Sequence, residues 1–334
     1  MITRSNGAQQ PPRWQTLLSE AITDPQELWR ELELPPHLLP AAARACGEFR
    51  LQIPRGFLRR MRKGDPSDPL LRQVLPIGEE LKRVPGYRLD PLEELAATAA
   101  PGVLHKYSGR VLITTTGACA VHCRYCFRRH YPYERATSSR QNARRILDYL
   151  LKNPDVNELI LSGGDPLTLS NARLAELTST LLNAPGLRRL RLHTRLPVVL
   201  PERLDAGLLE WLATVPLQVV VVIHCNHPNE IDASVQTGLR ELRCAGATLL
   251  NQAVLLRGVN DSVQTLAALS ERLMESSVLP YYLHQLDRVQ GAAHFEVDDA
   301  HAVTLMRELR ACLPGYLVPR LARERPGERS KALL

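Results

Sequence analysis

Three cysteines lie close together in this 334-residue sequence. Cys119, Cys123 and Cys126 form a CxxxCxxC run, and thiolates bind soft metals such as zinc and iron. A closed structural zinc site takes four ligands, for which His122 or His130 is a candidate fourth. An iron–sulfur cube bound by three cysteines leaves one iron open for a ligand from outside the protein. We favour the cluster over zinc, and over redox or incidental cysteines.

The cysteines follow the first of several predicted strands. Strand candidates begin at Arg110, Asn157, Leu187, Gln218, Ala247 and Val278. Helix-like segments lie between them and begin at Ser139, Ser170, Glu202, Asp232 and Asp261. Alternating strands and helices predict an α/β fold with a parallel barrel, complete or partial. In such a barrel the chemistry lies at the carboxyl ends of the strands, where the cysteine run and the motifs SGGDPL, HTR, HCNHPNE and HQLD occur.

Composition narrows the class of protein. The chain is 44% hydrophobic and 23% charged, with a net charge of +7. Its apolar runs fall short of the roughly 20 residues that span a bilayer, and its polar start lacks the apolar segment of a secretion signal. We therefore expect a soluble, cytoplasmic protein that does not bind membranes. The basic residues are dispersed, so we do not expect nucleic-acid binding.

The first hundred residues differ from the rest. They are rich in Pro, Arg and Leu, with short amphipathic stretches such as PQELWRELEL from Pro25 and GEELKRVPGY from Gly78. This pattern predicts an N-terminal, mainly helical region over residues 1–103. Residues 104–334 then form the barrel and its C-terminal tail.

The cysteine run carries a first resemblance to a known family. With Tyr125 before the last cysteine, it resembles the CxxxCxΦC signature of the radical S-adenosylmethionine (SAM) superfamily. This resemblance implies a partial (β/α)6 barrel, TIM-like in type, and a [4Fe–4S] cluster whose open iron binds SAM. The reduced cluster splits SAM to give a 5′-deoxyadenosyl radical. The positions implied for SAM are Ser162, Gly163, Gly164, Asp165, His224 and Gln252.

Further motifs narrow the resemblance to the lysine 2,3-aminomutase family, and within it to the short branch that serves translation elongation factor P. The similarity extends from about Leu104 to Lys331 and includes LHKYSGRVLITTTGACAVHCRYCFRRHYPY, ILSGGDPL, NQAVLLRGVND and PYYLHQLDRVQGAAHF. It implies an isomerase that converts L-α-lysine to (R)-β-lysine. The implied partners are an electron donor such as flavodoxin or ferredoxin and the ligase that attaches β-lysine to elongation factor P.

The family's second cofactor is pyridoxal 5′-phosphate (PLP), held as an imine on a lysine near the C-terminus. Lys331 matches that position, although composition alone would make it part of a frayed basic tail. Lys106, Tyr107 and Arg110 match the PLP-contacting segment. Two cations there suit a phosphate dianion.

Three charged residues match the positions that bind the substrate. Arg128 corresponds to the arginine that binds the substrate carboxylate, since its planar fork suits that group. Asp287 and Glu324 correspond to two acids that hold the far ammonium group, and Glu324 replaces an aspartate of the longer enzymes.

Two other functions remain open. One is an aminomutase of the same mechanism that acts on another amino acid, such as glutamate, or on a peptidyl lysine. The other is an inactive scaffold, against which Lys331 and the SGGD motif argue. Four further cysteines are interpreted as buried or incidental thiols, namely Cys46, Cys225, Cys244 and Cys312. Ser262 occupies the position of a zinc-binding cysteine of the longer enzymes, so we do not expect that zinc site.

Overall fold

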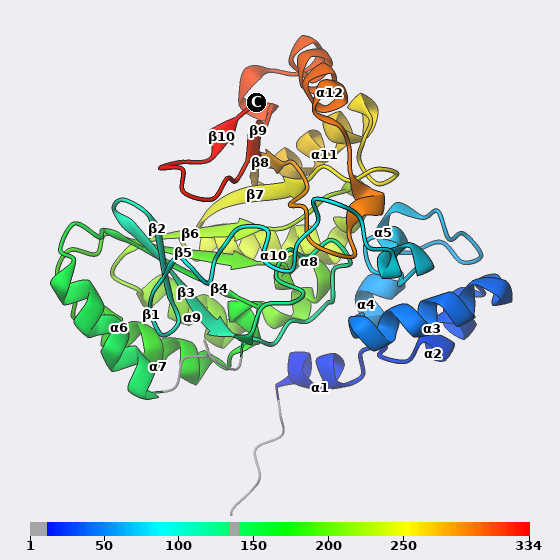
Figure 1. Ribbon diagram of the computed structural model, residues 1–334. Coiled ribbons are helices and arrows are strands. Elements are labelled where there is room, and N and C mark those ends of the chain that lie inside the picture. Colours follow the sequence, from blue (N-terminus) through cyan, green and yellow to red (C-terminus); the bar gives the residue numbers. More distant parts are fainter. Residues whose placement is uncertain (1–11, 134–139) are drawn as a thin grey trace, which may run out of the picture.

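The computed structural model describes residues 12–133 and 140–334. Its strands form one sheet in chain order, from β1 to β10 (Figure 1). The strands are β1 (Thr98–Ala100), β2 (Val103–Tyr107), β3 (Arg110–Thr116), β4 (Glu158–Gly163), β5 (Arg189–Thr194), β6 (Gln218–Ile223), β7 (Thr248–Val254), β8 (Leu279–His284), β9 (Arg320–Arg323) and β10 (Ala332–Leu333).

The parallel part of the sheet confirms the predicted barrel. Neighbouring strands from β3 to β9 pair in parallel, and all six predicted strands lie in this run. At the two ends, β1, β2 and β10 add in antiparallel pairs that the sequence did not predict. Among the described residues no pairing joins β1 to β10, so the barrel is partial.

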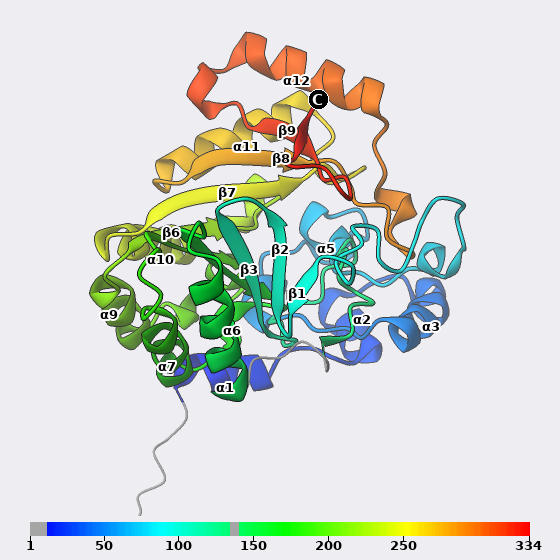
Figure 2. The same ribbon diagram turned by 60° about the vertical axis from the view of Figure 1, so that its left-hand side comes forward.

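Helices follow the strands as predicted (Figure 2). The predicted helices are α6 (Arg140–Lys152), α7 (Asn171–Leu181), α9 (Ala206–Thr214), α10 (Ala233–Cys244) and α11 (Val263–Glu275); the predicted start of the first, Ser139, lies outside the described residues. Ser170, Asp232 and Ser262 each accept a hydrogen bond from the first turn of the helix that follows, as N-caps do. Two helices were not predicted, α8 (Leu196–Val199) and α12 (Asp299–Cys312).

The N-terminal region is mainly helical. Its elements are α1 (Arg13–Ser19), α2 (Pro25–Leu32), η1 (Pro36–Leu38), α3 (Leu39–Glu48), α4 (Arg55–Leu58), α5 (Pro69–Arg72) and η2 (Gly78–Leu81). The stretch from Pro25 forms α2 as expected, whereas the stretch from Gly78 gives only one 3₁₀ turn. The boundary after residue 103 remains a prediction; it falls within β2.

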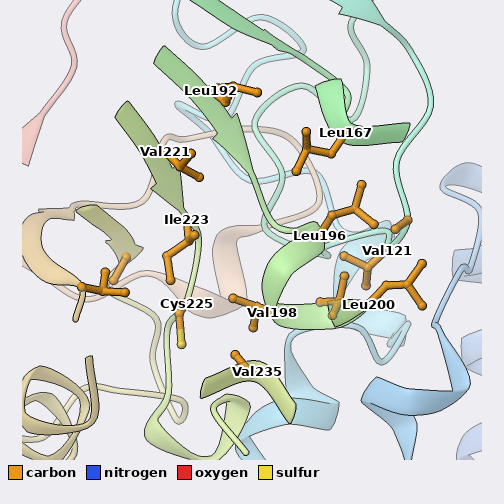
Figure 3. Close-up of a cluster of buried hydrophobic side chains, with 14 of the residues drawn as sticks. Val121, Leu167, Leu192, Leu196, Val198, Leu200, Val221, Ile223, Cys225 and Val235 are labelled. Carbon is orange, nitrogen blue, oxygen red and sulfur yellow. The ribbon is translucent and has the colours of Figure 1, made fainter. Parts of the chain in front are cut away.

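One hydrophobic core joins this region to the sheet. Trp14 and Leu28 belong to the same buried cluster as Ile113 of β3. Figure 3 shows another part of this core, where Val221 and Ile223 of β6 lie near Val198 of α8. Because the helices and the sheet share buried side chains, the N-terminal region is positioned firmly against the barrel.

The C-terminal segment is a hairpin, not a frayed tail. β10 pairs antiparallel with β9, with Ala332 opposite Arg323. Gly327 lies in the connection at φ 76°, a conformation that costs glycine little. The hairpin places Lys331 directly before β10.

Short 3₁₀ turns complete the fold: η4 (Pro166–Thr168), η5 (Pro201–Arg203), η6 (Pro228–Glu230), η7 (Ala293–Phe295) and η8 (Gly315–Leu317). In the described part of the chain, no helix has the length and apolar character needed to cross a membrane.

Candidate active site

Every site residue predicted from the sequence lines one cavity of about 610 Å³. The side chains come from the loop after β3 and from strands or loops along the rest of the sheet. Residues more than 200 positions apart, such as Cys119 and Lys331, therefore share its walls. The fold thus brings the whole predicted set together, while the role of each residue remains a proposal.

The three cysteines fit an iron–sulfur cluster. Burial raises the pKa of Cys119 well above its usual value, and the neighbouring Cys126 raises it further. Burial and then Cys123 raise the pKa of Cys126 to about 11. Clustered thiols of this kind become thiolates when bound cations offset their mutual repulsion.

A single metal ion needs several ligands directed at one position. Across residues 12–133 and 140–334, no three His, Cys, Asp or Glu side chains converge on one metal position. A four-iron cube does not require such convergence, because each thiolate binds a different iron.

Residues of the N-terminal region hold the cysteine loop. Gln52 Nε2 donates to the Cys119 carbonyl at 2.9 Å, and the His122 N–H donates to the Gln52 carbonyl at 3.0 Å. Arg124 is fully buried and makes two hydrogen bonds to Glu80, at 2.8 and 2.6 Å. Sequence reasoning missed Gln52 and Glu80, because nothing in their local pattern marks a contact with a distant loop.

The glycine pair after β4 permits a close backbone approach. Gly163 has φ 115°, and a Cβ there would lie 2.6 Å from the Thr116 carbonyl oxygen. The Gly164 N–H donates to that same oxygen at 2.7 Å. Glycine is therefore needed where β4 meets the start of the cysteine loop.

Asp165 connects this turn to the end of β5. Its carboxylate accepts hydrogen bonds from Thr194 Oγ1 and from the Arg195 N–H, both at 2.7 Å. Burial raises its pKa to about 6, although these hydrogen bonds act in the opposite direction. The geometry assigns Asp165 a role in holding two loops together; a direct contact with SAM remains a prediction.

His224 and Gln252, the other predicted SAM contacts, follow β6 and lie in β7. Burial lowers the pKa of His224 to about 4, and the positive charges of Arg195 and Arg128 contribute. The imidazole is therefore neutral at physiological pH. The side chain of Gln252 is buried and, within the described residues, has no hydrogen-bond partner, which leaves it available to a ligand.

Arg128 is engaged by an acid that sequence reasoning missed. Its Nε and Nη2 donate to the two carboxylate oxygens of Glu94 at 2.6 and 2.8 Å. Its Nη1 donates to Ser162 Oγ at 3.0 Å. Both charged side chains are buried. Burial opposes the charge of Arg128, but Glu94 raises its pKa well above the usual value. The guanidinium group of Arg128, which was expected to be free for the substrate carboxylate, already binds the carboxylate of Glu94.

Lys331 lies in a group of charges with Glu324. Its Nζ is 2.6 Å from Glu324 Oε2, and Lys106 Nζ is 2.8 Å from Glu324 Oε1. Burial would raise the pKa of Glu324, but Lys331 and Lys106 outweigh it and lower the pKa to about 2. Glu324 thus contacts the two lysines predicted to bind PLP, rather than standing open for substrate.

Asp287 has no such partner. No hydrogen bond or ion pair reaches its carboxyl from the described residues. Burial, and then the charge of Glu324, raises its pKa to about 7. A half-buried carboxyl without a partner that lines a cavity suits a cationic ligand.

Tyr107 and Arg110 complete this side of the cavity. The Arg110 guanidinium carbon lies 4.7 Å from the centre of the Tyr107 ring, a cation–π contact. The pair comes from β2 and β3, which pair antiparallel with Tyr107 opposite Arg110.

The four further cysteines can also be compared with the structure. Cys225 is buried, Cys46 half-buried, and Cys244 and Cys312 exposed, and all are free. His227 is the N-cap of η6, and Asp232 is the N-cap of α10. Asn226 is buried, and its Nδ2 donates to Tyr125 in the cysteine loop at 2.7 Å.

Comparisons with known proteins agree with this site. A family model described as the radical SAM superfamily matches residues 113–267. The L-lysine 2,3-aminomutase of Escherichia coli (strain K12) is 48% identical over 96% of this chain and 94% of that protein. The L-lysine 2,3-aminomutase of Haemophilus influenzae is 46% identical over 96% and 95%. That of Clostridium subterminale is 33% identical over 94% of this chain and 75% of its own length.

Such identity extends over nearly the whole chain and, for the first two relatives, over nearly their whole length. A similarity confined to the barrel would have shown only the superfamily. The chain belongs to the L-lysine 2,3-aminomutase family of radical SAM enzymes.

Proposed function

We propose that this protein is a PLP-dependent, radical SAM L-lysine 2,3-aminomutase, an isomerase that moves the α-amino group of L-lysine to C3 and gives (R)-β-lysine. One observation carries the proposal: the three cysteines share a cavity with Lys331, Arg128 and the unpaired carboxyl of Asp287. When bound, the [4Fe–4S] cluster and SAM supply a radical that removes a hydrogen atom, and PLP supplies a conjugated ring through which the amino group can move.

At the cysteine loop, Cys119, Cys123 and Cys126 would hold the cluster. Gln52 and the buried Arg124 fix the loop, so the three thiolates keep their relative positions. The cavity walls also keep water and stray hydrogen donors from a radical.

At Arg128, the substrate carboxylate would bind beside Glu94. Glu94 Oε1 also lies 3.4 Å from Lys106 Nζ. The substrate carboxylate would therefore share Arg128 and Lys106 with Glu94, whose two hydrogen bonds keep the plane of the guanidinium fixed.

At Lys331, a proton must leave before the amine can bond to PLP. The amine must also leave Glu324 Oε2, to which Lys331 Nζ donates at 2.6 Å. Asp287 lines the same cavity, and its pKa, raised to about 7 by burial and by the charge of Glu324, allows either protonation state near neutral pH. In its charged form Asp287 would also bind the far ammonium group of lysine.

The partners are also proposals. The cluster needs one electron from a low-potential protein such as flavodoxin or ferredoxin, and β-lysine would pass to the ligase that modifies elongation factor P. We propose a cytoplasmic location, which the seven free cysteines support because a reducing compartment keeps thiols unpaired.

The test is anaerobic reconstitution with iron, sulfide, SAM and PLP, followed by mass analysis of products from isotopically labelled L-lysine. The proposal predicts a product of unchanged mass with nitrogen on C3. SAM cleavage without any rearranged amino acid, together with activity on glutamate or a lysyl peptide, would favour the alternative substrate.

A further inference from the structure

Arg195 connects a proposed cluster ligand to residues that the proposed function does not use. It directly follows β5 and is buried. Its Nη1 lies 2.7 Å from Cys123 Sγ. Its Nη2 donates to Gln73 Oε1 at 2.6 Å and to Glu230 Oε2 at 3.0 Å.

The guanidinium is fixed from several sides. Its carbon lies 5.6 Å from the centre of the Phe57 ring and 5.7 Å from that of Tyr125. The Arg195 N–H is bound by Asp165. Arg195 and its counter-ion Glu230 are both buried, so water screens their charges only weakly.

We propose that Arg195 raises the reduction potential of the iron–sulfur cluster by donating a hydrogen bond to the Cys123 thiolate. The inference rests on the proposed assignment of the cluster to the three cysteines. On reduction, [4Fe–4S]²⁺ accepts one electron from the donor and becomes [4Fe–4S]⁺, which adds negative charge near the sulfur. A fixed cationic donor stabilises the reduced form more than the oxidised form, and hydrogen bonds to sulfur are a known determinant of potential.

A purely structural role is the competing explanation. Arg195 joins Gln73 of the N-terminal region to Glu230 after β6, and this alone would stabilise the fold. Such a role does not need Nη1 to point at Cys123. The two explanations differ in one measurable quantity, the reduction potential of the cluster in folded protein.

The experiment is a redox titration of the reconstituted full-length protein with dithionite and mediator dyes, without SAM. The EPR signal of the reduced cluster is followed in the unmodified protein, Arg195→Met and Arg195→Lys. At a fixed potential, Arg195→Met should lower the ratio of reduced to oxidised cluster at least tenfold, which is about 59 mV for one electron. Arg195→Lys keeps the charge but loses the planar guanidinium group. Its ratio of reduced to oxidised cluster should lie between those of the unmodified protein and Arg195→Met.

Arg203→Met is the matched control. Arg203 is fully buried and donates to the carbonyls of Leu167 and Leu169, so the potential should stay unchanged. Arg195→Gln, which keeps a donor without the charge, decides the question if Arg195→Met does not fold. The reduction potential of the cluster in Arg195→Gln should also lie below that of the unmodified protein.

The outcomes separate the two proposals. If Arg195→Met or Arg195→Gln binds four irons and keeps the original potential, the inference is overturned and the proposed function stands. If the unmodified protein forms no EPR-active cluster, the proposed function itself fails.

Discussion

The cysteine part of the cavity (Cys119, Cys123, Cys126) is held by hydrogen bonds and a fully buried ion pair with fixed neighbours, whereas its lysine part (Lys106, Glu324, Lys331) consists of partly buried ion pairs among the site residues themselves. The Cys119 carbonyl accepts a hydrogen bond from Gln52, and Arg195 donates to Cys123 Sγ. In the lysine part, one carboxylate is shared between two ammonium groups. Ion pairs of this kind can exchange partners when a charged ligand arrives.

The difference matches two chemical tasks. A cluster needs thiolates at constant positions, which a loop bound to buried neighbours provides. Lys331 must leave Glu324 before its amine can bond to PLP. Its contacts in the ligand-free protein therefore have to be ones that a ligand can replace. The short hairpin of β9 and β10 suits this task, because only a few pairs join β10 to the sheet.

Replacing Cys119, Cys123 or Cys126 by Ala should have the largest effect. Each change removes one cluster ligand, so SAM cleavage to methionine and 5′-deoxyadenosine should be abolished while the fold persists. Chromatography of the products and iron analysis measure this. Cys312→Ala, at an exposed cysteine, should retain full cleavage, and retained cleavage in any of the first three variants would refute the cluster assignment.

Lys331→Ala should abolish covalent attachment of PLP but not SAM cleavage by the cluster. Borohydride reduction converts an imine to a stable amine, so peptide mapping should find the adduct on Lys331 alone in the unmodified protein. Lys152→Ala, at the end of α6, serves as control. An adduct on Lys106 would show that the C-terminal hairpin has another role.

Asp287→Asn should lower kcat/KM for lysine by about a hundredfold or more. Once the substrate fills the cavity, an ammonium group without its carboxylate partner costs roughly 3–5 kcal/mol. Because the pKa of Asp287 is raised to about 7, lysine binding should weaken as the pH falls through 7. Steady-state kinetics from pH 6 to 8.5 test both points; an unchanged rate would bring the alternative substrate forward.

The same substitution should stabilise the ligand-free protein above pH 7. Asp287 has a folded pKa near 7, above the unfolded value of about 3.9. Its contribution to stability is therefore lost as the pH rises between these values. Asp287→Asn should raise the free energy of unfolding at pH 8 by roughly 1–3 kcal/mol, with little gain at pH 4. Urea unfolding measures this change. A lower free energy of unfolding for the variant at pH 8 would contradict the conclusion that the Asp287 carboxyl is unpaired.

Gln52→Ala should have the smallest effect. It removes one hydrogen bond to the cysteine loop, at a cost of about 1 kcal/mol. Thermal unfolding should detect this loss, together with slower retention of iron. Gln218→Ala, at an exposed position in β6, should change neither the thermal stability nor the retention of iron. If the two variants behaved alike, the loop would not depend on the Gln52 contact.

The sequence predicted the six strands from β3 to β8 and the cysteine loop, because strand period and cysteine spacing are local patterns. Helix α12 could also have been found, since buried Ala302, Leu305, Met306 and Leu309 follow a helical period. The hairpin that positions Lys331 could not, because β9 has four residues and β10 has two, which is too short to show a strand period. Glu94 was missed for another reason: a lone acid carries no sign of the buried arginine that it meets across the fold.

Hydrogen transfer between the two parts of the cavity tests the central claim most directly. SAM labelled with deuterium at C5′ is incubated anaerobically with reconstituted protein and unlabelled L-lysine. If the cysteine part and the lysine part act on one molecule, deuterium should appear in β-lysine, and Lys331→Ala should show none in any amino acid. Deuterium confined to 5′-deoxyadenosine, with β-lysine formed unlabelled, would contradict the account.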